Sequence, residues 1–579
     1  MFLKPLAWWP GHVGGSWRIS VSAGSVTPRR RKRRAQPKGR QVDAAAHGAV
    51  LEALGEIPRH RDQLLQCLHS LNDRYGCLRA EHLVALADEL RLSMTEVYEV
   101  ATFYHHFQIV KEGDANPTSL TVRVCDSITC SMFGAENLVS SLEGRFGADV
   151  RIQRVSCVGR CEDAPVAVCG HKPLPKATVA SVSRAVADRD VEPETLSPVD
   201  YAEYRHGGGY NLWAECVDGK RDRETIIQAM EDSSLRGLGG AGFPTGRKWR
   251  LVGKRPAPRV VAINLDEGEP GTFKDRYFLE RDPHRFLEGT LIAAWAIDSD
   301  KIFIYIRDEY TACRRMLERE LAALRADPPA PLPKIYLRRG AGAYIAGEES
   351  GMLESIEGKR AMPRLRPPYI AQNGLFGLAT LEQNMETMHW VRDLLEKGAD
   401  GFASQGRHGR KGVRSFSVSG RVNKPGIHIA PAGITVRELI DEYCGGMQAG
   451  HQLYGYFPGG ASGGILPASK ADVPLDFDTL QPYGCFIGSA AIIVFSQHDK
   501  ARELARNAMR FFSHESCGQC TPCRVGTVKA TELMTAEHWD KGLLGDLSRV
   551  MVDGSICGLG QAAPNTMDCI MKYFPEEVA

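Results

Sequence analysis

The sequence predicts a multidomain α/β protein, and three observations carry this prediction. The chain has 579 residues, which is too many for one hydrophobic core. Apolar residues follow helical spacing near both ends, whereas strand-like and helical segments alternate between about residues 220 and 400. Eight of the 16 cysteines fall into two closely spaced groups in different parts of the chain, which indicates two cysteine-bearing domains.

The composition is that of an ordinary globular protein. Hydrophobic residues make up 43% of the chain and charged residues 25%, and the net charge is +2. A net charge this small gives no general attraction to nucleic acid or to membranes. The apolar stretch at residues 485–495 is too short to span a bilayer. We therefore expect a cytoplasmic protein that inserts into no membrane and binds no nucleic acid.

Residues 1–45 differ from the rest of the chain. They combine Trp, Gly and Pro with the basic run RRRKRR at residues 29–34. No apolar segment follows the arginines, which argues against a secretory or twin-arginine signal and hence against disulfide bonds. We expect a disordered basic arm, and the alternative is a segment that contacts a partner subunit or nucleic acid.

The next two segments are expected to be a helical part and a small α/β domain. Residues 46–115 contain four stretches with helical apolar spacing, and Ser93 is placed as an N-cap before Glu96. Residues 116–195 are predicted to form a strand (119–125), a helix (134–147) and two further strands (150–157 and 164–170). The first cysteine group follows these strands, in loops where side chains can converge.

The remaining chain divides into three parts. After a predicted linker at residues 197–210, the alternating segments of residues 196–408 predict a mainly parallel sheet with helices on both faces. Short strands, turns and one helix predict a compact α+β module over residues 409–496. Residues 497–579 are again helical, and the second cysteine group interrupts them.

The two cysteine groups have the spacing of iron–sulfur ligands. Each group can hold four soft thiolates near one point, and C-x4-C with C-x3-C suits a [2Fe–2S] cluster, whereas C-x2-C-x2-C suits a [4Fe–4S] cluster. Structural zinc is the alternative for both groups. The fourth ligand of the second group is Cys557 or Cys569, and Cys557 is preferred because it lies in a Gly-rich loop. The first group is Cys125, Cys130, Cys157 and Cys161, and the second is Cys517, Cys520 and Cys523 with that fourth residue.

A glycine-rich loop at residues 235–249 matches G-x-G-x-x-G through Gly237, Gly239 and Gly242. A Rossmann fingerprint follows a strand, but a helical segment precedes this loop, so the match is formal. The loop can be a structural turn or a nucleotide site. In the second case Lys248 suits a phosphate and Phe243 offers a ring for a base or a nicotinamide.

Two acidic loops favour the nucleotide interpretation. Asn264, Asp266, Glu267 and Glu269 follow a predicted strand, where ligands bind in α/β folds. Glu348–Glu349 stand at a predicted helix start after another Gly-rich turn. The alternatives are a solvated acidic loop and charge pairing at a helix N-terminus. Taken together, the three loops predict a crevice for a nucleotide or a flavin.

The motifs of the second half, in their order, resemble the flavoprotein subunit of NADH dehydrogenases, which binds FMN, NADH and [4Fe–4S] in respiratory complex I. They are RGLGGAGFPTGRKW, NLDEGEPGTFKDR, GAGAYIAGEES, RLRPPYIAQNGLFG and SCGQCTPCRVGT with ICGLGQAAPN. Upstream, VYEVATFYHHF, VRVCDSITC and CVGRCEDAP resemble its thioredoxin-like [2Fe–2S] partner subunit. The fusion, with VRVCDSITCSMFGAENL and PGGASGGILPAS, is most similar to the β subunit of cytosolic NAD-dependent formate dehydrogenases, which are molybdenum or tungsten enzymes.

The resemblance implies a fold and a set of site residues. The fold is a thioredoxin-like [2Fe–2S] domain with a helical N-terminal part, a Rossmann-like FMN/NAD domain, a β-grasp domain and a C-terminal helical bundle that holds [4Fe–4S]. FMN is expected at Gly237, Gly239, Gly240, Lys248, Asn264, Asp266, Glu267, Gly347, Glu348, Gln383, Asn384 and Thr387. NAD is expected at Gly242, Phe243, Glu269, Glu349, Arg366 and Tyr369. Cys557 completes the [4Fe–4S] ligands.

Three positions depart from the family pattern. Arg366 replaces a lysine and Tyr369 stands where phenylalanine is common, so charge and ring are kept with a changed geometry. Gln383 replaces an asparagine, which moves the same amide one methylene outward.

The implied activity is that of a diaphorase. Electrons from formate, oxidised on a separate α subunit with further iron–sulfur clusters, are expected to reach NAD+ through the clusters and FMN, and hydride transfer needs no catalytic side chain. One alternative keeps this module and changes the partner to that of an NAD-reducing hydrogenase or of respiratory complex I. Another is a non-catalytic assembly subunit stabilised by zinc or clusters.

Overall fold

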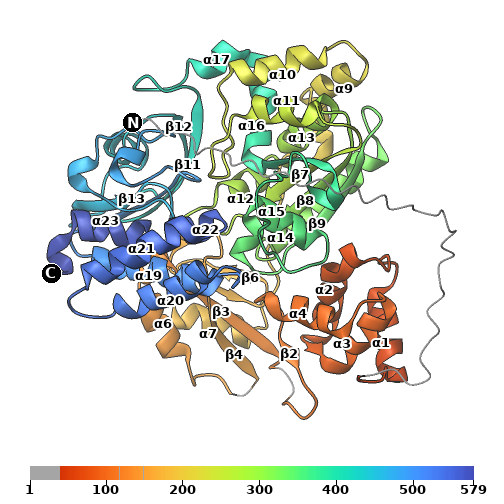
Figure 1. The fold of residues 1–579 in the computed structure, drawn as a ribbon, viewed down its shortest axis with the longest axis horizontal. Coiled ribbons are helices and arrows are strands. Elements are labelled where there is room, and N and C mark those ends of the chain that lie inside the picture. The colour runs from red at the N-terminus through yellow and green to blue at the C-terminus, as the bar shows by residue number, and fades with distance from the viewer. Residues whose placement is uncertain (1–38, 116–117, 148) are drawn as a thin grey trace, which may run out of the picture. The chain divides into compact units, whose positions relative to one another are not determined.

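The computed structural model describes residues 39–115, 118–147 and 149–579 (Figure 1). Residues 42–579 form one compact unit. Most of the expected basic arm, residues 1–38, lies outside the described residues. Among the helices of the described part, none has both the length and the apolar character that crossing a membrane requires.

The helical N-terminal part begins two residues earlier than expected. Its helices are α1 (Ala44–Leu54), α2 (Leu64–Tyr75), α3 (Ala80–Glu89) and α4 (Met94–Phe103). Ser93 caps α4 as predicted, because its hydroxyl accepts from the backbone N–H of Glu96 and the Glu96 carboxylate accepts from that of Ser93. Two short parallel strands, β1 (Leu78–Arg79) and β2 (Ile109–Val110), tie the start of α3 to the segment after α4.

The small α/β domain has the predicted strands and helix. Its sheet order is β4-β3-β5-β6, with β3 and β4 parallel and the other two pairs antiparallel. The strands are β3 (Leu120–Cys125), β4 (Val150–Val155), β5 (Ala167–Cys169) and β6 (Lys172–Leu174), and the helices are α5 (Ile128–Met132), α6 (Ala135–Leu142) and α7 (Val179–Ala187). Leu138, Val139 and Val182 cover one face of this sheet in its own small core.

The predicted linker at residues 197–210 is wrong as a description of that segment. It contains α8 (Tyr201–His206), capped by the Asp200 carboxylate, and α9 (Asn211–Val217) follows it. Tyr204 is buried, and its hydroxyl donates to the Glu288 carboxylate at 2.6 Å. The three glycines that follow α8 made this segment resemble a linker. Its tyrosines pack in the core that contains α13 (Pro283–Ala296).

The largest domain contains a four-stranded parallel sheet in the order β10-β7-β8-β9. The strands are β7 (Arg259–Leu265), β8 (Ser299–Ile306), β9 (Lys334–Arg339) and β10 (Ala379–Asn384). The helices are α10 (Arg223–Asp232), α11 (Thr245–Gly253), α12 (Lys274–Leu279), α13 (Pro283–Ala296), α14 (Thr311–Ala326), α15 (Glu349–Ile356), α16 (Met385–Lys397) and α17 (Ala399–Ala403). Val261 and Ile263 face the core that contains α13, whereas Val260 and Ala262 face a second core, as a sheet covered on both faces requires (Figure 1).

A buried histidine on α16 makes this domain sensitive to acid. His389 packs at 4.0 Å against the Phe278 ring, and burial lowers its pKa to about 3. Because an unfolded histidine titrates near pH 6.5, the unfolded chain binds the proton first, so stability falls as the pH drops from about 6.5 towards 3. We expect a loss of about 2 kcal/mol between pH 7 and pH 5.

The variant His389→Met tests whether His389 causes this loss of stability in acid. Methionine fills the site without a titratable ring, so the acid-side decline of the thermal midpoint should be shallower than in the unchanged protein. Equal slopes in both proteins between pH 7 and pH 5 would assign the decline to other groups.

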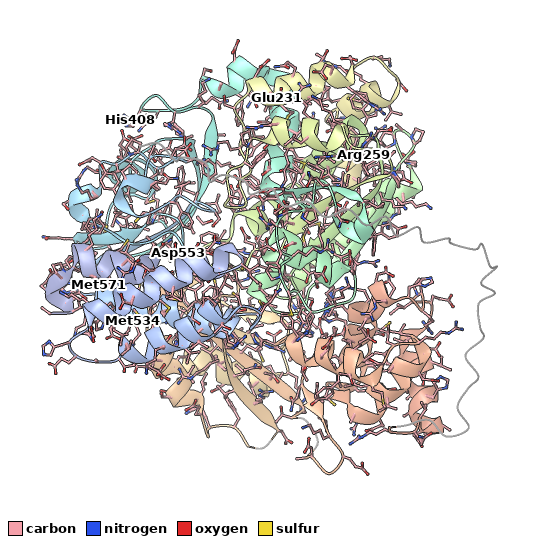
Figure 2. All side chains as sticks on the ribbon, in the orientation of Figure 1. Glu231, Arg259, His408, Met534, Asp553 and Met571 are labelled. Carbon is pink, nitrogen blue, oxygen red and sulfur yellow. The ribbon has the colours of Figure 1, made fainter. Side chains whose placement is uncertain are left out.

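The last two parts are a mixed sheet and a helical bundle. The sheet order is β12-β11-β15-β13-β14. Its strands are β11 (Val413–Gly420), β12 (Gly426–Pro431), β13 (Leu453–Phe457), β14 (Leu466–Pro467) and β15 (Ala491–Ser496). The bundle consists of α19 (Ala501–Glu515), α20 (Thr521–Leu533), α21 (Lys541–Gly554), α22 (Gly558–Ala562) and α23 (Asn565–Tyr573). Met534, labelled in Figure 2, follows α20 and is fully buried in the core that the sheet and the bundle share.

Candidate functional site

The first cysteine group converges as the spacing predicts. Cys125 ends β3, Cys130 lies on α5, and Cys157 and Cys161 flank the loop after β4. All four side chains are buried, and the sulfur atoms of Cys157 and Cys161 lie 3.4 Å apart. Hydrogen bonds from the Cys125 and Cys161 thiols hold the pKa of Cys157 well below its usual range. Four buried sulfurs gathered around the same two loops suit a four-thiolate metal centre.

The largest domain holds the loop of this cysteine group through two arginines. Arg307 donates to the Cys157 carbonyl at 2.8 Å, and Arg276 donates to the Gly159 carbonyl at 2.9 Å. A Cβ atom at Gly159 would lie 2.2 Å from the Tyr310 hydroxyl oxygen, and its φ is +70°. Only glycine therefore fits this contact. Arg307 and Tyr310 also donate to Glu267, so they hold the cysteine loop beside the acidic loop that begins at Asn264.

Removing the positive charge of Arg307 should lower the midpoint potential of a cluster held by these cysteines. A nearby cation stabilises the reduced, more negative cluster, so Arg307→Gln should lower the potential by an amount on the order of tens of mV. Arg307→Lys keeps the charge and should shift it less. Redox titration followed by electron paramagnetic resonance measures the potential in both variants. Equal potentials in the unchanged protein, Arg307→Gln and Arg307→Lys would contradict this electrostatic role of Arg307.

The second cysteine group also forms one pocket. Cys517, Cys520 and Cys523 line it together with Cys557, and Ile345 and Pro363 of the largest domain close one side. Cys569 lies elsewhere, with its sulfur 3.6 Å from that of Cys485. The structure therefore brings Cys557 to the pocket and keeps Cys569 away from it.

The glycine-rich loop lies against the start of α16. The backbone N–H of Leu238 donates to the Thr387 hydroxyl at 2.9 Å, and a Cβ atom at Gly239 would lie 3.0 Å from that of Asn384. A Cβ atom at Gly240 would meet nothing within 4 Å, so the backbone there borders open space. Gly242 serves packing, because a Cβ atom there would lie 2.4 Å from the Phe477 ring.

The polar edge of the sheet forms a connected network. Asn264 donates from Nδ2 to the Gly347 carbonyl at 2.8 Å, and Lys248 Nζ lies 2.7 Å from Glu382 and 3.7 Å from Glu349. Burial raises the pKa of Asp266 well above its usual range. The structure thus joins Lys248, Asn264, Gly347 and Glu349 at one edge.

The Glu348–Glu349 pair lies where α15 begins. Glu348 caps the helix by accepting from the N–H groups of Ser350 and Gly351, both at 2.9 Å, and also pairs with Arg366. Arg366 pairs with Glu349 as well, at 3.0 Å. The expected NAD-binding rings are exposed, Phe243 to 40% and Tyr369 to 56%, which leaves their faces available for stacking.

Two predicted ligand carboxylates are engaged within the protein. Glu267 accepts from the N–H groups of Asp275 and Arg276 and from the Tyr310 hydroxyl at 2.8 Å. Burial raises the pKa of Glu267 to about 7. Glu269 accepts from the N–H and hydroxyl of Ser462, at 2.7 and 2.8 Å, and from the Tyr344 hydroxyl. Their roles as FMN and NAD contacts stay predictions.

Sequence reasoning missed Lys274, which lies on α12 and is 1% exposed. Its Nζ lies 2.7 Å from Asp275, 3.1 Å from Glu386 and 3.3 Å from the Asn384 oxygen. Although burial opposes the charge, the two carboxylates raise the pKa of Lys274 above its usual range. Glu382 on β10 was missed as well. Lys274 stands inside the motif NLDEGEPGTFKDR, which could have pointed to it, whereas Glu382 pairs with Lys248 from another element and has no such signal.

These groups fit the cofactors that the sequence predicts. Asp266 Oδ2 and Gln383 Nε2 are buried and have no hydrogen-bond partner within the described ranges. Such orphaned groups cost free energy unless a ligand satisfies them. With the open space beside Gly240, they suit the polar edge of a flavin, and the two cysteine groups suit metal centres.

Family models match the chain in four places. They are the thioredoxin-like [2Fe-2S] ferredoxin over residues 50–189, the Nuo51 FMN-binding domain over residues 230–393, the SLBB domain over residues 415–466 and the NADH-ubiquinone oxidoreductase-F iron-sulfur binding region over residues 503–579. These matches confirm the predicted fold class and favour iron–sulfur clusters over zinc at both cysteine groups.

Curated relatives match about two thirds of the chain. The F subunit 2 of the NADH-quinone oxidoreductase of Rhizobium meliloti is 38% identical over 407 residues, which cover 67% of this chain and 96% of that protein. The F subunit of the Aquifex aeolicus NADH-quinone oxidoreductase is 38% identical over 393 residues, which cover 65% of this chain and 89% of that protein. A chain of an NAD+-reducing [NiFe]-hydrogenase in the H2-reduced state has a TM-score of 0.78 at 30% identity, over 90% of this chain and 92% of its own.

The fold and the sites define an NAD(H)-linked electron-transfer subunit with an FMN-binding domain and two iron–sulfur domains. The chain belongs to the family of NADH-quinone oxidoreductase F subunits. It carries a thioredoxin-like [2Fe–2S] domain ahead of its Nuo51 FMN-binding domain.

Proposed function

We propose that this chain is a diaphorase subunit that passes electrons between its iron–sulfur clusters and NAD through FMN. The observation that carries the proposal is the short segment between β9 and α15. Ile345 lines the pocket of the second cysteine group, and Gly347, two residues later, belongs to the polar edge where FMN is expected. One turn of backbone thus borders both sites, as a path between a cluster and a flavin requires.

The predicted ligand sets belong to this proposal. Cys125, Cys130, Cys157 and Cys161 would hold [2Fe–2S], and Cys517, Cys520, Cys523 and Cys557 would hold [4Fe–4S]. The FMN and NAD contacts are those given by the family resemblance. The six expected parts, from the basic arm at residues 1–45 to the [4Fe–4S] bundle at residues 497–579, belong to this proposal as well, and helix α1 begins at Ala44.

The chain's own residues would bind and orient the ligands. FMN, when bound, exchanges a hydride with NAD and single electrons with clusters. Burial raises the pKa of Asp266 above its usual range, and its unpartnered Oδ2 would offer the flavin a hydrogen-bonding group. Lys248, between Glu382 and Glu349, keeps its charge and suits a phosphate. No side chain needs to act as an acid or a base.

The finer proposal is that the electrons come from formate. It rests on the resemblance of the fused chain, and of PGGASGGILPAS in particular, to the β subunits of cytosolic formate dehydrogenases. The partner would be a molybdenum or tungsten α subunit that oxidises formate and carries further clusters, and the complex would act in the cytoplasm. A second candidate partner is a hydrogenase, because the NAD+-reducing hydrogenase chain shares this fold over 90% of both lengths or more.

Purification of the native complex tests the diaphorase proposal and the formate assignment separately. The proposal predicts a flavin-containing complex that reduces dyes with NADH and reduces NAD+ with formate. Reduction of NAD+ by hydrogen in place of formate would overturn the formate assignment and favour the hydrogenase. A colourless zinc protein without NADH-dependent dye reduction would overturn the diaphorase itself.

A further inference from the structure

A third cluster of ligand-type side chains lies outside both cysteine groups. His105, His514 and Glu515 each offer one nitrogen or oxygen, and these atoms all lie within 4.8 Å of one another. His105 follows α4, whereas His514 and Glu515 are the last residues of α19. Segments separated by about 400 residues therefore meet at one point on the surface.

The three side chains combine two exposed rings with one buried carboxylate. Both imidazoles are exposed, with ring centroids 4.2 Å apart, whereas Glu515 is only 6% exposed. His514 Nδ1 lies 3.2 Å from Glu515 Oε1. Two ligands on one tetrahedral zinc ion, bound at about 2.1 Å, lie roughly 3.4 Å apart. A small cation can therefore replace the proton between these two atoms with little movement.

The carboxylate is held in place by groups that do not compete with a cation. Glu515 Oε1 accepts from the Ser156 hydroxyl at 2.7 Å, and Oε2 accepts from the Tyr344 N–H at 3.0 Å. Each carboxylate oxygen has two lone pairs, so both can accept these hydrogen bonds and one can still bind a metal. Such outer contacts orient ligands in natural metal sites.

The surrounding charges leave the site open to a cation. Glu309 adds negative potential beside His105, and next to His514 the charge of Arg510 is offset by its ion pair with Asp126 at 3.0 Å. The described part of the chain holds another three-residue group of this kind, formed by His69, Asp73 and His106. That group is less open to a cation, because the Arg339 guanidinium already pairs with Asp73.

We propose that His105, His514 and Glu515 bind a borderline divalent cation of the zinc class, with water completing its coordination. Two imidazoles and one carboxylate are ligands that zinc prefers. The bound ion would cross-link the end of α4 to the end of α19, only two residues before Cys517. It would thus join the N-terminal helical part to the segment that presents the second cysteine group.

Zinc content of the intact holoenzyme tests this site. After equilibration with Zn2+ and desalting, metal analysis should find one equivalent of zinc less in His105→Gln and in His514→Gln than in the unchanged protein. His498→Gln is the matched control, because His498 is exposed, lies 5.3 Å from the His451 ring and belongs to no three-ligand group of the described residues. Its zinc content should equal that of the unchanged protein.

Two further readouts keep the result decisive. Iron is measured in the same samples and must stay constant, since zinc that enters by displacing cluster iron would overturn the proposal. Zinc should raise the thermal midpoint of the unchanged protein and of His498→Gln, and should leave the midpoints of the two site variants unshifted. Equal zinc content and equal shifts in all four proteins would also overturn it.

Discussion

Cys520→Ser is expected to abolish reduction of NAD+ by the partner subunit while leaving NADH-dependent dye reduction in place. Cys520 lies in the pocket lined by Cys517, Cys523 and Cys557. Serine lacks the soft thiolate that an iron–sulfur cluster requires, so the [4Fe–4S] centre should be lost. We expect partner-driven activity to fall to background, because one link of the path is removed. Dyes that take electrons directly from the flavin bypass that link.

Two companion variants decide the fourth ligand. Cys557→Ser should reproduce the loss, whereas Cys569→Ser should keep the cluster, because Cys569 lies beside Cys485 and outside the pocket. Electron paramagnetic resonance of the reduced protein and iron content measure the cluster in each variant. Full partner-driven activity in Cys520→Ser, or loss of the cluster in Cys569→Ser alone, would contradict the assigned ligands.

Lys274→Met is expected to destabilise the FMN-binding domain and to reduce its flavin content. Lys274 is the counter-charge of two carboxylates, Asp275 and Glu386, which are each 1% exposed. Removing one partner of a buried ion pair costs about 3–5 kcal/mol, because the remaining charge is left uncompensated. The Asn384 oxygen loses a donor as well, and Asn384 is an expected FMN contact. Thermal unfolding and flavin content per chain measure both effects.

The matched control is Lys529→Met. Lys529 forms a surface pair with Glu532, with both side chains more than half exposed, and such pairs contribute little. The free energy of unfolding of Lys529→Met should differ from that of the unchanged protein by less than about 0.5 kcal/mol. If Lys274→Met behaved like this control, the counter-charge role of Lys274 would be wrong.

The sequence predicted what depends on local chemistry. The capping box at Ser93, the helix before the glycine loop and the helix start at Glu348–Glu349 follow from neighbouring residues, and all three are confirmed. Within each cysteine group the close pairs or the triple are visible in the sequence, whereas the fold brings Cys125 to Cys157 and Cys523 to Cys557.

The missed features depend on contacts between distant elements. Lys274 and Glu382 resemble ordinary charged residues in the sequence, and only the fold shows that each is buried against a partner. Gly242 matched a nucleotide fingerprint, although the Phe477 ring from another domain also requires glycine there. Residues 201–206 form a helix because their tyrosines find a packing surface that local sequence does not display.

Anaerobic titration of the purified chain with NADH tests the central claim most directly. Visible absorbance follows the flavin, and electron paramagnetic resonance follows the two clusters in the same samples. The account predicts that NADH bleaches a stoichiometric flavin and that signals of a reduced [2Fe–2S] and a reduced [4Fe–4S] centre appear as NADH is added. A chain that binds no flavin, or a flavin that NADH leaves oxidised, would contradict it.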